Sequence, residues 1–306
     1  MKKNNVCCML CGNNVSFTGK KPRDKESADI VICEVCGHIQ MYPLLSPEET
    51  QDEYDNDTAN RFGKVKISEG SDFETMRLKF SEWSKEHADI YFETLQGYRN
   101  VLDLGAGYGF FMEEINKRPG RNFNIEGIEI GKFRLDNFVG GIVYNLNVLT
   151  DKFPDNLHKR YDCIISIHLL EHIGNPILFL EKIKPLLKED GHVIFEVPNI
   201  NCYLGEISPV YKDFMYFYEH CSYFSAESLR FLFEKSGYSV KSIQTYEIYS
   251  IENHCRWVRD GVPSIKLHQM YMPDARLEWI NRIYKDEVGK QGKGYSLTIT
   301  ATPKKQ

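Results

Sequence analysis

Three glycines at alternate positions follow a short apolar run in the first half of this 306-residue chain. The run Val101–Leu104 contains one charged residue, Asp103, and Gly105, Gly107 and Gly109 come directly after it. Glycine tolerates a positive φ and lets a ligand approach the backbone closely. In open α/β sheets, ligands bind where a strand ends in such a turn. The segment therefore predicts a strand followed by a cofactor-binding loop.

A glutamate at the end of the next predicted strand fits the same chemistry. Glu129 lies 20 residues after Gly109, where a carboxylate can accept hydrogen bonds from both ribose hydroxyls of a nucleoside. A dinucleotide fingerprint requires a small residue where this chain has Phe110, so a nicotinamide dehydrogenase is disfavoured. Asn147 and Val148 follow the third predicted strand, and we expect the adenine ring beside them.

Four cysteines near the N-terminus form two matched pairs. Cys8 and Cys11, and then Cys33 and Cys36, are each separated by two residues, and a glycine follows each pair. Paired thiolates of this kind hold structural zinc in a closed tetrahedral site. A segment of about 45 residues cannot stabilise itself by core burial alone, which gives the metal a structural role. Scattered buried cysteines or a redox dithiol are the alternatives.

Two histidine-containing segments supply candidates for proton transfer. His168 follows a predicted strand at residues 161–167 and should face the cofactor pocket, and Glu171 and His172 begin the turn beyond it. A later run contains the other candidates, Tyr218, Glu219 and His220. A histidine with an ordinary pKa near 6.5 suits general base catalysis at neutral pH. We expect His220 to be the base and Glu219 to orient it, with Tyr218 and His172 as further catalytic residues; a buried packing histidine is the alternative.

Composition restricts the class of protein. The net charge is −5, from 38 basic and 43 acidic residues, which does not indicate a nucleic-acid partner. No apolar run approaches the roughly 20 residues that span a bilayer, and the start Met-Lys-Lys-Asn-Asn-Val does not resemble a signal peptide. We therefore expect a cytoplasmic protein whose nine cysteines are free thiols or metal ligands. The oligomeric state is left open.

Three zones follow from the order of these features: a zinc-binding module at 1–45, a helical connector at 46–99, and a cofactor-binding domain at 100–306 with an insertion at about 251–292. A capping box at Ser46–Glu49 predicts a helix start, and a second helix is expected at 72–96. Alternating strands and helices in the third zone predict an α/β fold, a doubly wound, seven-stranded, mostly parallel sheet. The expected strands are 100–104, 125–130, 142–146, 161–167, 192–197, 239–249 and 295–302, and the expected helices are 109–118, 131–138, 176–188 and 225–236.

Taken together, these motifs resemble class I S-adenosylmethionine-dependent methyltransferases. The resemblance rests on the glycine loop, Glu129, the stretch from Asp162 to His172, and Glu196-Val197-Pro198-Asn199. The four cysteines and the run from Tyr218 to Ser225 narrow it to zinc-containing methyltransferases of nucleotide-linked deoxysugars, such as sugar C-methyltransferases. The resemblance implies a Rossmann-like fold, S-adenosylmethionine as cofactor, and Asp103 near the loop backbone or the cofactor's amino group.

The chain departs from that narrower group in two respects. Sugar C-methyltransferases usually carry an additional C-terminal domain, and they tend to have a Gly-Gly-Ser-Leu-Arg-like run where this chain has Asn253-His254-Cys255-Arg256. The acceptor therefore stays open, as does the choice of carbon, oxygen or nitrogen as the methylated atom. The first alternative is a methyltransferase of a peptide, an amine or a lipid-linked acceptor. The second is a non-catalytic binding protein with this fold.

Overall fold

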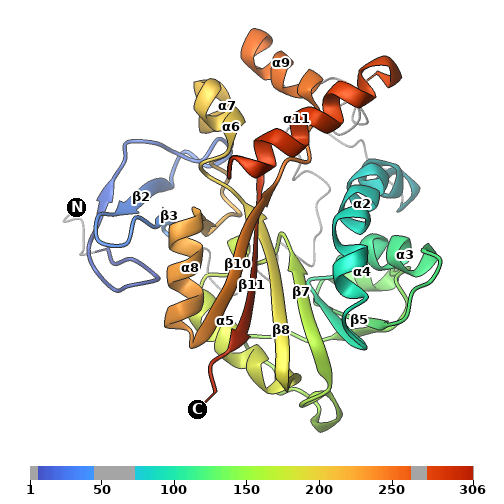
Figure 1. Cartoon of the computed structure of the whole chain (residues 1–306). Coiled ribbons are helices and arrows are strands. Elements are labelled where there is room, and N and C mark those ends of the chain that lie inside the picture. The colour runs from blue at the N-terminus through green and yellow to red at the C-terminus, as the bar shows by residue number, and fades with distance from the viewer. Residues whose placement is uncertain (1–5, 45–72, 263–273, 306) are drawn as a thin grey trace. The chain divides into compact units, whose positions relative to one another are not determined.

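A computed structural model of the chain describes residues 6–44, 73–262 and 274–305, so the predicted capping box at Ser46 lies outside the described residues. A seven-stranded sheet has the order β10-β11-β8-β7-β4-β5-β6, which confirms the predicted α/β class (Figure 1). Strands β4, β5, β6 and β7 pair in parallel, whereas β11 is antiparallel to β8 and β10. The bounds are β4 Asn100–Leu104, β5 Asn124–Glu129, β6 Val143–Asn145, β7 Tyr161–Ile167, β8 Leu187–Pro198, β10 Tyr238–Tyr246 and β11 Ser296–Pro303.

The predicted helices are present with small shifts at their ends. Helix α3 spans Phe110–Lys117, α4 Lys132–Asp136 and α8 Ala226–Lys235. The helix expected at 176–188 is shorter: α5 ends at Ile183, a 3₁₀ turn covers Lys184–Leu186, and β8 begins at Leu187. Pro185 explains the difference, because proline has no backbone N–H and disfavours helix in the residue before it.

The chain divides into two compact units, one formed by 46–166 and 185–191, and the other by 1–45, 167–184 and 192–306. The first, which we call the glycine-loop unit, contains β4 to β7. Helix α2, Phe73–Leu95, confirms the helix predicted at 72–96 and packs on α3. The Phe73 and Phe110 rings lie 5.6 Å apart. The apolar face of α2 therefore covers the helix that begins at the end of the glycine loop.

The second unit, which we call the cysteine–histidine unit, contains a small four-stranded antiparallel sheet. Its strands are β1 Val15–Phe17, β2 Asp29–Cys33, β3 Ile39–Tyr42 and β9 Ser222–Tyr223. Ile39 pairs with Tyr223, although the two are far apart in sequence. The N-terminal cysteine segment is therefore joined by backbone hydrogen bonds to the segment that follows His220.

Aromatic side chains form the core of the cysteine–histidine unit. Phe195 on β8 contacts Phe179 of α5 and Phe233 of α8 with ring centroids 6.3 and 5.6 Å apart. Helix α8 begins at a capping box formed by Ser225 and Ser228. The insertion expected at 251–292 contains α9 Ile251–Asp260 and α11 Glu278–Lys290, and two short helices, α6 Tyr203–Ile207 and α7 Pro209–Phe214, precede it.

Within the described ranges, every helix is too short or too polar to cross a lipid bilayer.

Candidate functional site

The glycine loop has the backbone conformation that its sequence predicts. Gly105, Gly107 and Gly109 have φ values of 76°, 59° and 79°. The last two differ in what surrounds them. A Cβ added to Gly107 would meet no atom within 4 Å, whereas one added to Gly109 would lie 2.5 Å from the backbone nitrogen of Gly140. Gly107 therefore borders open space that a ligand can fill, and Gly109 permits close packing inside the unit.

Glu129 holds this loop through its carboxylate. One carboxylate oxygen accepts from the backbone N–H of Gly107 at 2.8 Å, and the other accepts from Ile130 and Gly131 at 2.8 and 2.9 Å. The Arg134 guanidinium lies 3.8 Å from the first oxygen. The side chain is buried, with 3% of the residue exposed. The predicted acid at the strand end is therefore in contact with the loop.

Asp103 is on β4, two residues before the loop, and is buried. Burial, together with the negative charge of Glu129, raises the pKa of Asp103 to about 7. Near neutral pH this carboxyl is therefore poised between its neutral and charged forms. Val148 is buried, and the Asn147 side chain accepts from the backbone N–H of Leu149 at 2.9 Å, so this pair forms a tight turn after β6.

The structure brings together two of the predicted catalytic histidines in the cysteine–histidine unit. The rings of His172 and His220 lie 4.8 Å apart and nearly perpendicular. The Nδ1 atom of His172 lies 3.0 Å from the backbone carbonyl oxygen of Glu219, which accepts a hydrogen bond from it. Burial, and then the nearby His172, lowers the pKa of His220 to about 3. His220 is therefore neutral at physiological pH, and its pKa lies well below the ordinary value near 6.5 that the sequence led us to expect, which makes it a weaker base than expected.

His168 lies between two buried carboxylates. Its Nδ1 is 3.2 Å from Glu171 and its Nε2 is 3.4 Å from Glu196. Burial lowers the pKa of His168, but the interactions with Glu171 and then Glu196 outweigh it and raise the pKa to about 10. His168 also has a positive φ of 53°, which is uncommon for a residue with a side chain. The two carboxylates therefore favour the charged form of His168, and its Nδ1 contacts Glu171.

Tyr218, the remaining predicted catalytic residue, contacts the N-terminal segment. Its backbone N–H donates to Asp24 at 2.9 Å, and the Lys25 ammonium lies 4.7 Å from the centre of its ring. The structure therefore gives Tyr218 a binding partner in the loop between β1 and β2.

The four predicted metal ligands also lie together. The Sγ atoms of Cys8 and Cys36 are 3.5 Å apart, and those of Cys11 and Cys33 are 3.4 Å apart. All four sulfur atoms lie within 4.8 Å of one another, and none forms a disulfide. Tetrahedral zinc with Zn–S bonds of about 2.3 Å would place the sulfurs about 3.8 Å apart. The cluster has the size of such a site.

The turns around the cysteines follow the expected pattern. Gly12 and Gly37 have φ values of 78° and 70°, and their backbone N–H groups donate to Cys8 and Cys33 carbonyls at 2.9 and 2.8 Å. Cys7 is exposed and lies outside the cluster. His38 is buried, 3.3 Å from the Ser222 hydroxyl, and is likewise outside it.

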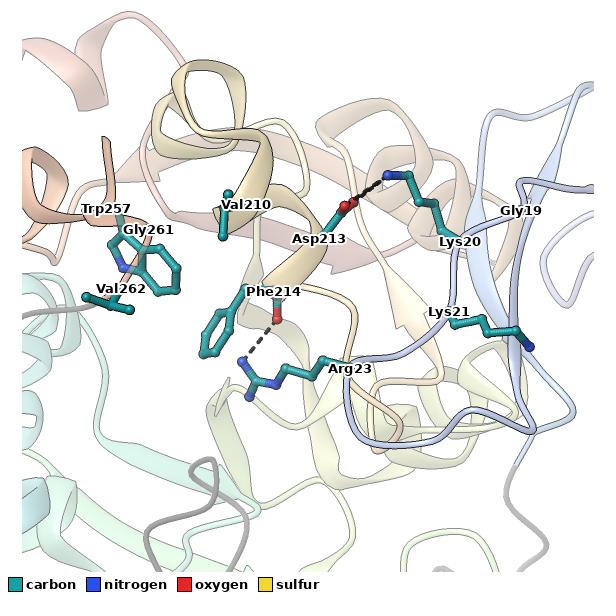
Figure 2. A pocket seen from close by; sticks show the side chains of 10 residues that line it. All are labelled: Gly19, Lys20, Lys21, Arg23, Val210, Asp213, Phe214, Trp257, Gly261 and Val262. Carbon is teal, nitrogen blue, oxygen red and sulfur yellow. Dashed lines mark hydrogen bonds and ion pairs between the residues drawn. The ribbon is translucent and has the colours of Figure 1, made fainter. Parts of the chain in front are cut away.

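A cavity of about 530 Å³ opens on the cysteine–histidine unit (Figure 2). The Phe214 and Trp257 rings lie 4.9 Å apart in its wall. The guanidinium of Arg23 stacks 3.6 Å from the centre of the Phe214 ring and donates to the Phe214 carbonyl at 3.0 Å. Lys20 pairs with Asp213 at 2.8 Å. The cavity thus combines aromatic surface with a positive side chain.

Comparison with known proteins decides the family. The sequence profile of a methyltransferase domain family, described as "Methyltransferase domain", matches residues 71–243. That range covers more than half of the chain and includes the glycine loop, Glu129 and the histidine pair. The chain belongs to this methyltransferase domain family.

Individual relatives of this methyltransferase domain protein are distant. The ubiquinone biosynthesis O-methyltransferase of Vibrio vulnificus is 26% identical over 107 residues, which are 34% of this chain and 45% of that protein. The chain thus spans about half the length of the curated relatives it matches first. An uncharacterised protein of Methanocaldococcus jannaschii is 22% identical over 182 residues, which cover 56% of this chain and 84% of the relative.

One solved structure supports the fold. A chain in the complex between the Haloferax volcanii Trm112 methyltransferase activator and the putative methyltransferase superposes with a TM-score of 0.50 and 14% identity. The match covers 76% of this chain and 95% of that one. At this identity the likeness establishes a Rossmann-like methyltransferase fold.

The sequence analysis of this methyltransferase domain missed two buried acids of the histidine cluster. Glu171 was noted only as the start of a turn and Glu196 only as part of a family motif, yet both lie within 3.4 Å of His168. The sequence did contain a signal for Glu171, because this residue directly precedes His172 and lies three residues after His168. The sequence did not show that both acids are buried.

Proposed function

We propose that this protein transfers a methyl group from S-adenosylmethionine to a small-molecule acceptor. The observation that carries the proposal is the glycine loop held by a buried Glu129 at the ends of two parallel strands. Family membership supports the same reaction. The non-catalytic alternative gives no reason for an open space beside Gly107.

The residues of the glycine-loop unit suit an adenosyl ligand. In this proposal Glu129 accepts hydrogen bonds from the ribose hydroxyls, Gly107 allows the ligand to approach the backbone, and Asp103 attracts the ammonium group. Asn147 and Val148 border the adenine ring. When bound, S-adenosylmethionine supplies an already activated methyl group, so the protein's main task is to orient donor and acceptor. Orientation can account for roughly 7–11 kcal/mol of a barrier.

We assign removal of the acceptor's proton to the histidine pair. His220 is the proposed base, and His172 is its neighbour, oriented by the Glu219 carbonyl. For a hydroxyl acceptor His220 takes the hydroxyl proton, and for a 4-keto sugar it takes a proton from the carbon next to the carbonyl. We propose that Tyr218 binds the acceptor and does not remove its proton.

His220→Ala tests that assignment. We expect the variant to bind S-adenosylmethionine as the wild type does, because Gly107 and Glu129 are unchanged. Turnover should fall by roughly 10²–10⁴ because proton transfer is impaired. Single-turnover kinetics with labelled donor measures the fall. A near-wild-type rate would remove His220 from the mechanism.

A nucleotide-linked sugar is the acceptor class that we propose. The cavity of Figure 2 has aromatic rings for a base, at Phe214 and Trp257, and a cation for phosphate, at Arg23. Stacking on aromatic side chains and ion pairing with arginine are the usual means of binding such groups. The name of the Vibrio relative favours oxygen as the methylated atom. A peptide, an amine or a lipid-linked acceptor is the second candidate.

We also propose that the four cysteines hold a structural zinc ion, because their sulfurs have the separations of a tetrahedral site. None of the nine cysteines forms a disulfide in the described structure, and we propose on this basis a reducing, cytoplasmic location.

The acceptor is tested by incubating the protein with methyl-labelled S-adenosylmethionine and a set of nucleotide-linked sugars, with mass spectrometry of the products. We expect label in one nucleotide sugar and loss of labelling in an Arg23→Ala, Phe214→Ala double variant. A matched control, Arg230→Ala, alters an exposed arginine of α8 that does not line the cavity. Label in peptides or amines alone would favour the second candidate.

A further inference from the structure

Glu171, His172 and His220 form a compact group in the cysteine–histidine unit. One ligand-type atom from each lies within 4.8 Å of the other two. The Nε2 atom of His172 is 4.0 Å from a carboxylate oxygen of Glu171. Two imidazoles and one carboxylate are the donor set that divalent transition metals prefer, whereas Ca²⁺ and Mg²⁺ prefer oxygen alone.

The surroundings of this group match the outer shell of a metal site. Ligating histidines almost always donate their second ring N–H to a carbonyl or carboxylate. His172 does so, because its Nδ1 lies 3.0 Å from the Glu219 carbonyl oxygen, and this contact leaves Nε2 as the electron-pair donor. Glu171 is held at its Oε1 by His168 at 3.2 Å.

The remaining oxygen of Glu171 provides an independent observation. The residue is only 1% exposed, and its Oε2 is buried without a hydrogen-bond partner among the described residues. A buried carboxylate oxygen without a partner is strongly unfavourable. A bound cation would remove this penalty, and the two imidazoles beside the carboxylate supply the other ligands.

We infer that Glu171, His172 and His220 bind one divalent transition-metal ion, distinct from the ion at the four cysteines. A tetrahedral site with bonds of about 2.0–2.2 Å to nitrogen and oxygen places the ligand atoms about 3.4 Å apart. Separations of up to 4.8 Å would therefore shorten by up to about 1.4 Å when the ion binds. Three protein ligands leave further coordination positions open.

The open positions suit an oxygen of the acceptor. This step rests on the proposed methyl transfer, whereas metal binding itself does not. A hydroxyl or carbonyl oxygen on the ion is polarised, so the acceptor's proton is released to water while His172 and His220 stay bound as ligands. With the ion bound, His220 acts as a ligand instead of as the base, and the ion and water perform the proton removal that is otherwise proposed for the histidine pair.

Manganese distinguishes this site from the cysteines, because Mn²⁺ favours nitrogen and oxygen ligands over thiolates. We expect electron paramagnetic resonance of the full chain titrated with Mn²⁺ to show one bound ion. Glu171→Gln and His220→Asn should each weaken binding at least 10-fold, and His158→Gln, an exposed histidine elsewhere, should leave it unchanged. Thermal unfolding with and without Mn²⁺ gives a second readout: Mn²⁺ should raise the wild-type midpoint and not that of Glu171→Gln.

Two results would overturn the inference: no Mn²⁺ binding by the folded wild type at millimolar concentration, or wild-type affinity in both variants. Methyl transfer that is unchanged by removing the ion would refute only the role in catalysis. Metal binding without S-adenosylmethionine binding would instead refute the proposed function and leave the site standing. The two failures are therefore distinguishable.

Discussion

Gly107 and Gly109 show how the same residue type serves two purposes within one loop. Both have left-handed backbone, but a Cβ at Gly107 enters open space, whereas a Cβ at Gly109 meets Gly140 at 2.5 Å. The sequence pattern places both glycines in a binding loop and does not separate their roles. The separation depends on a segment some 30 residues later that folds back onto the loop.

This difference predicts different outcomes for two alanine variants. Gly107→Ala should lower the free energy of unfolding by only about 1–2 kcal/mol, from backbone strain, and weaken S-adenosylmethionine binding at least 10-fold. Gly109→Ala should destabilise the fold by more, about 3 kcal/mol or above, because backbone atoms would have to move. Chemical denaturation and calorimetry measure the two quantities. Equal destabilisation by both substitutions would contradict the assignment.

Asp103 should make stability depend on pH. The folded-state pKa is about 7 and the ordinary value is 3.8, so folding favours the protonated carboxyl. Its stabilising contribution is complete below about pH 4 and is lost as the pH rises through 7. Asp103→Asn stays neutral, so its stability relative to wild type should rise by a few kcal/mol between pH 4 and pH 8. Denaturation curves across this range test it, and parallel pH profiles for the two proteins would refute it.

Among the elements, those with a strong periodic pattern were predictable. Strand β7 and strand β4 have the predicted bounds, because apolar runs bounded by polar residues determine both. The small sheet β1-β2-β3-β9 was not predicted, because its strands have two to five residues and β9 pairs with β3 across most of the chain. Such short segments have too little pattern to read, and their pairing is a tertiary property.

The cysteine cluster should be needed for this small sheet. We predict that Cys33→Ser combined with Cys36→Ser removes about one equivalent of zinc and exposes the amides of β2 and β3 to hydrogen exchange. The metal joins the two ends of a segment that buries little apolar surface. Cys7→Ser, at an exposed cysteine outside the cluster, is the matched control. Elemental analysis that finds no metal in the wild-type protein would refute the prediction.

For the whole molecule, the order of motifs along the chain predicted the seven-stranded sheet. The expected zones 1–45, 46–99 and 100–306 remain a prediction about domain organisation. The compact units of the structure instead combine segments that are distant in the sequence. The reason is physical: β9 and the cysteine segment share a sheet, a pairing that no local pattern reports. The histidine cluster was only partly predictable. The sequence shows His172 and His220 as candidates, but it does not show that their rings are in contact.

The central claim is that the glycine loop and Glu129 bind an adenosyl group. Isothermal titration calorimetry with S-adenosylmethionine and with S-adenosylhomocysteine tests it directly. We predict one bound ligand per chain, affinity reduced at least 10-fold in Glu129→Ala, and no change in Glu189→Ala, which alters an exposed glutamate of the same unit. Absence of binding to the folded wild type, or full affinity in Glu129→Ala, would contradict the account.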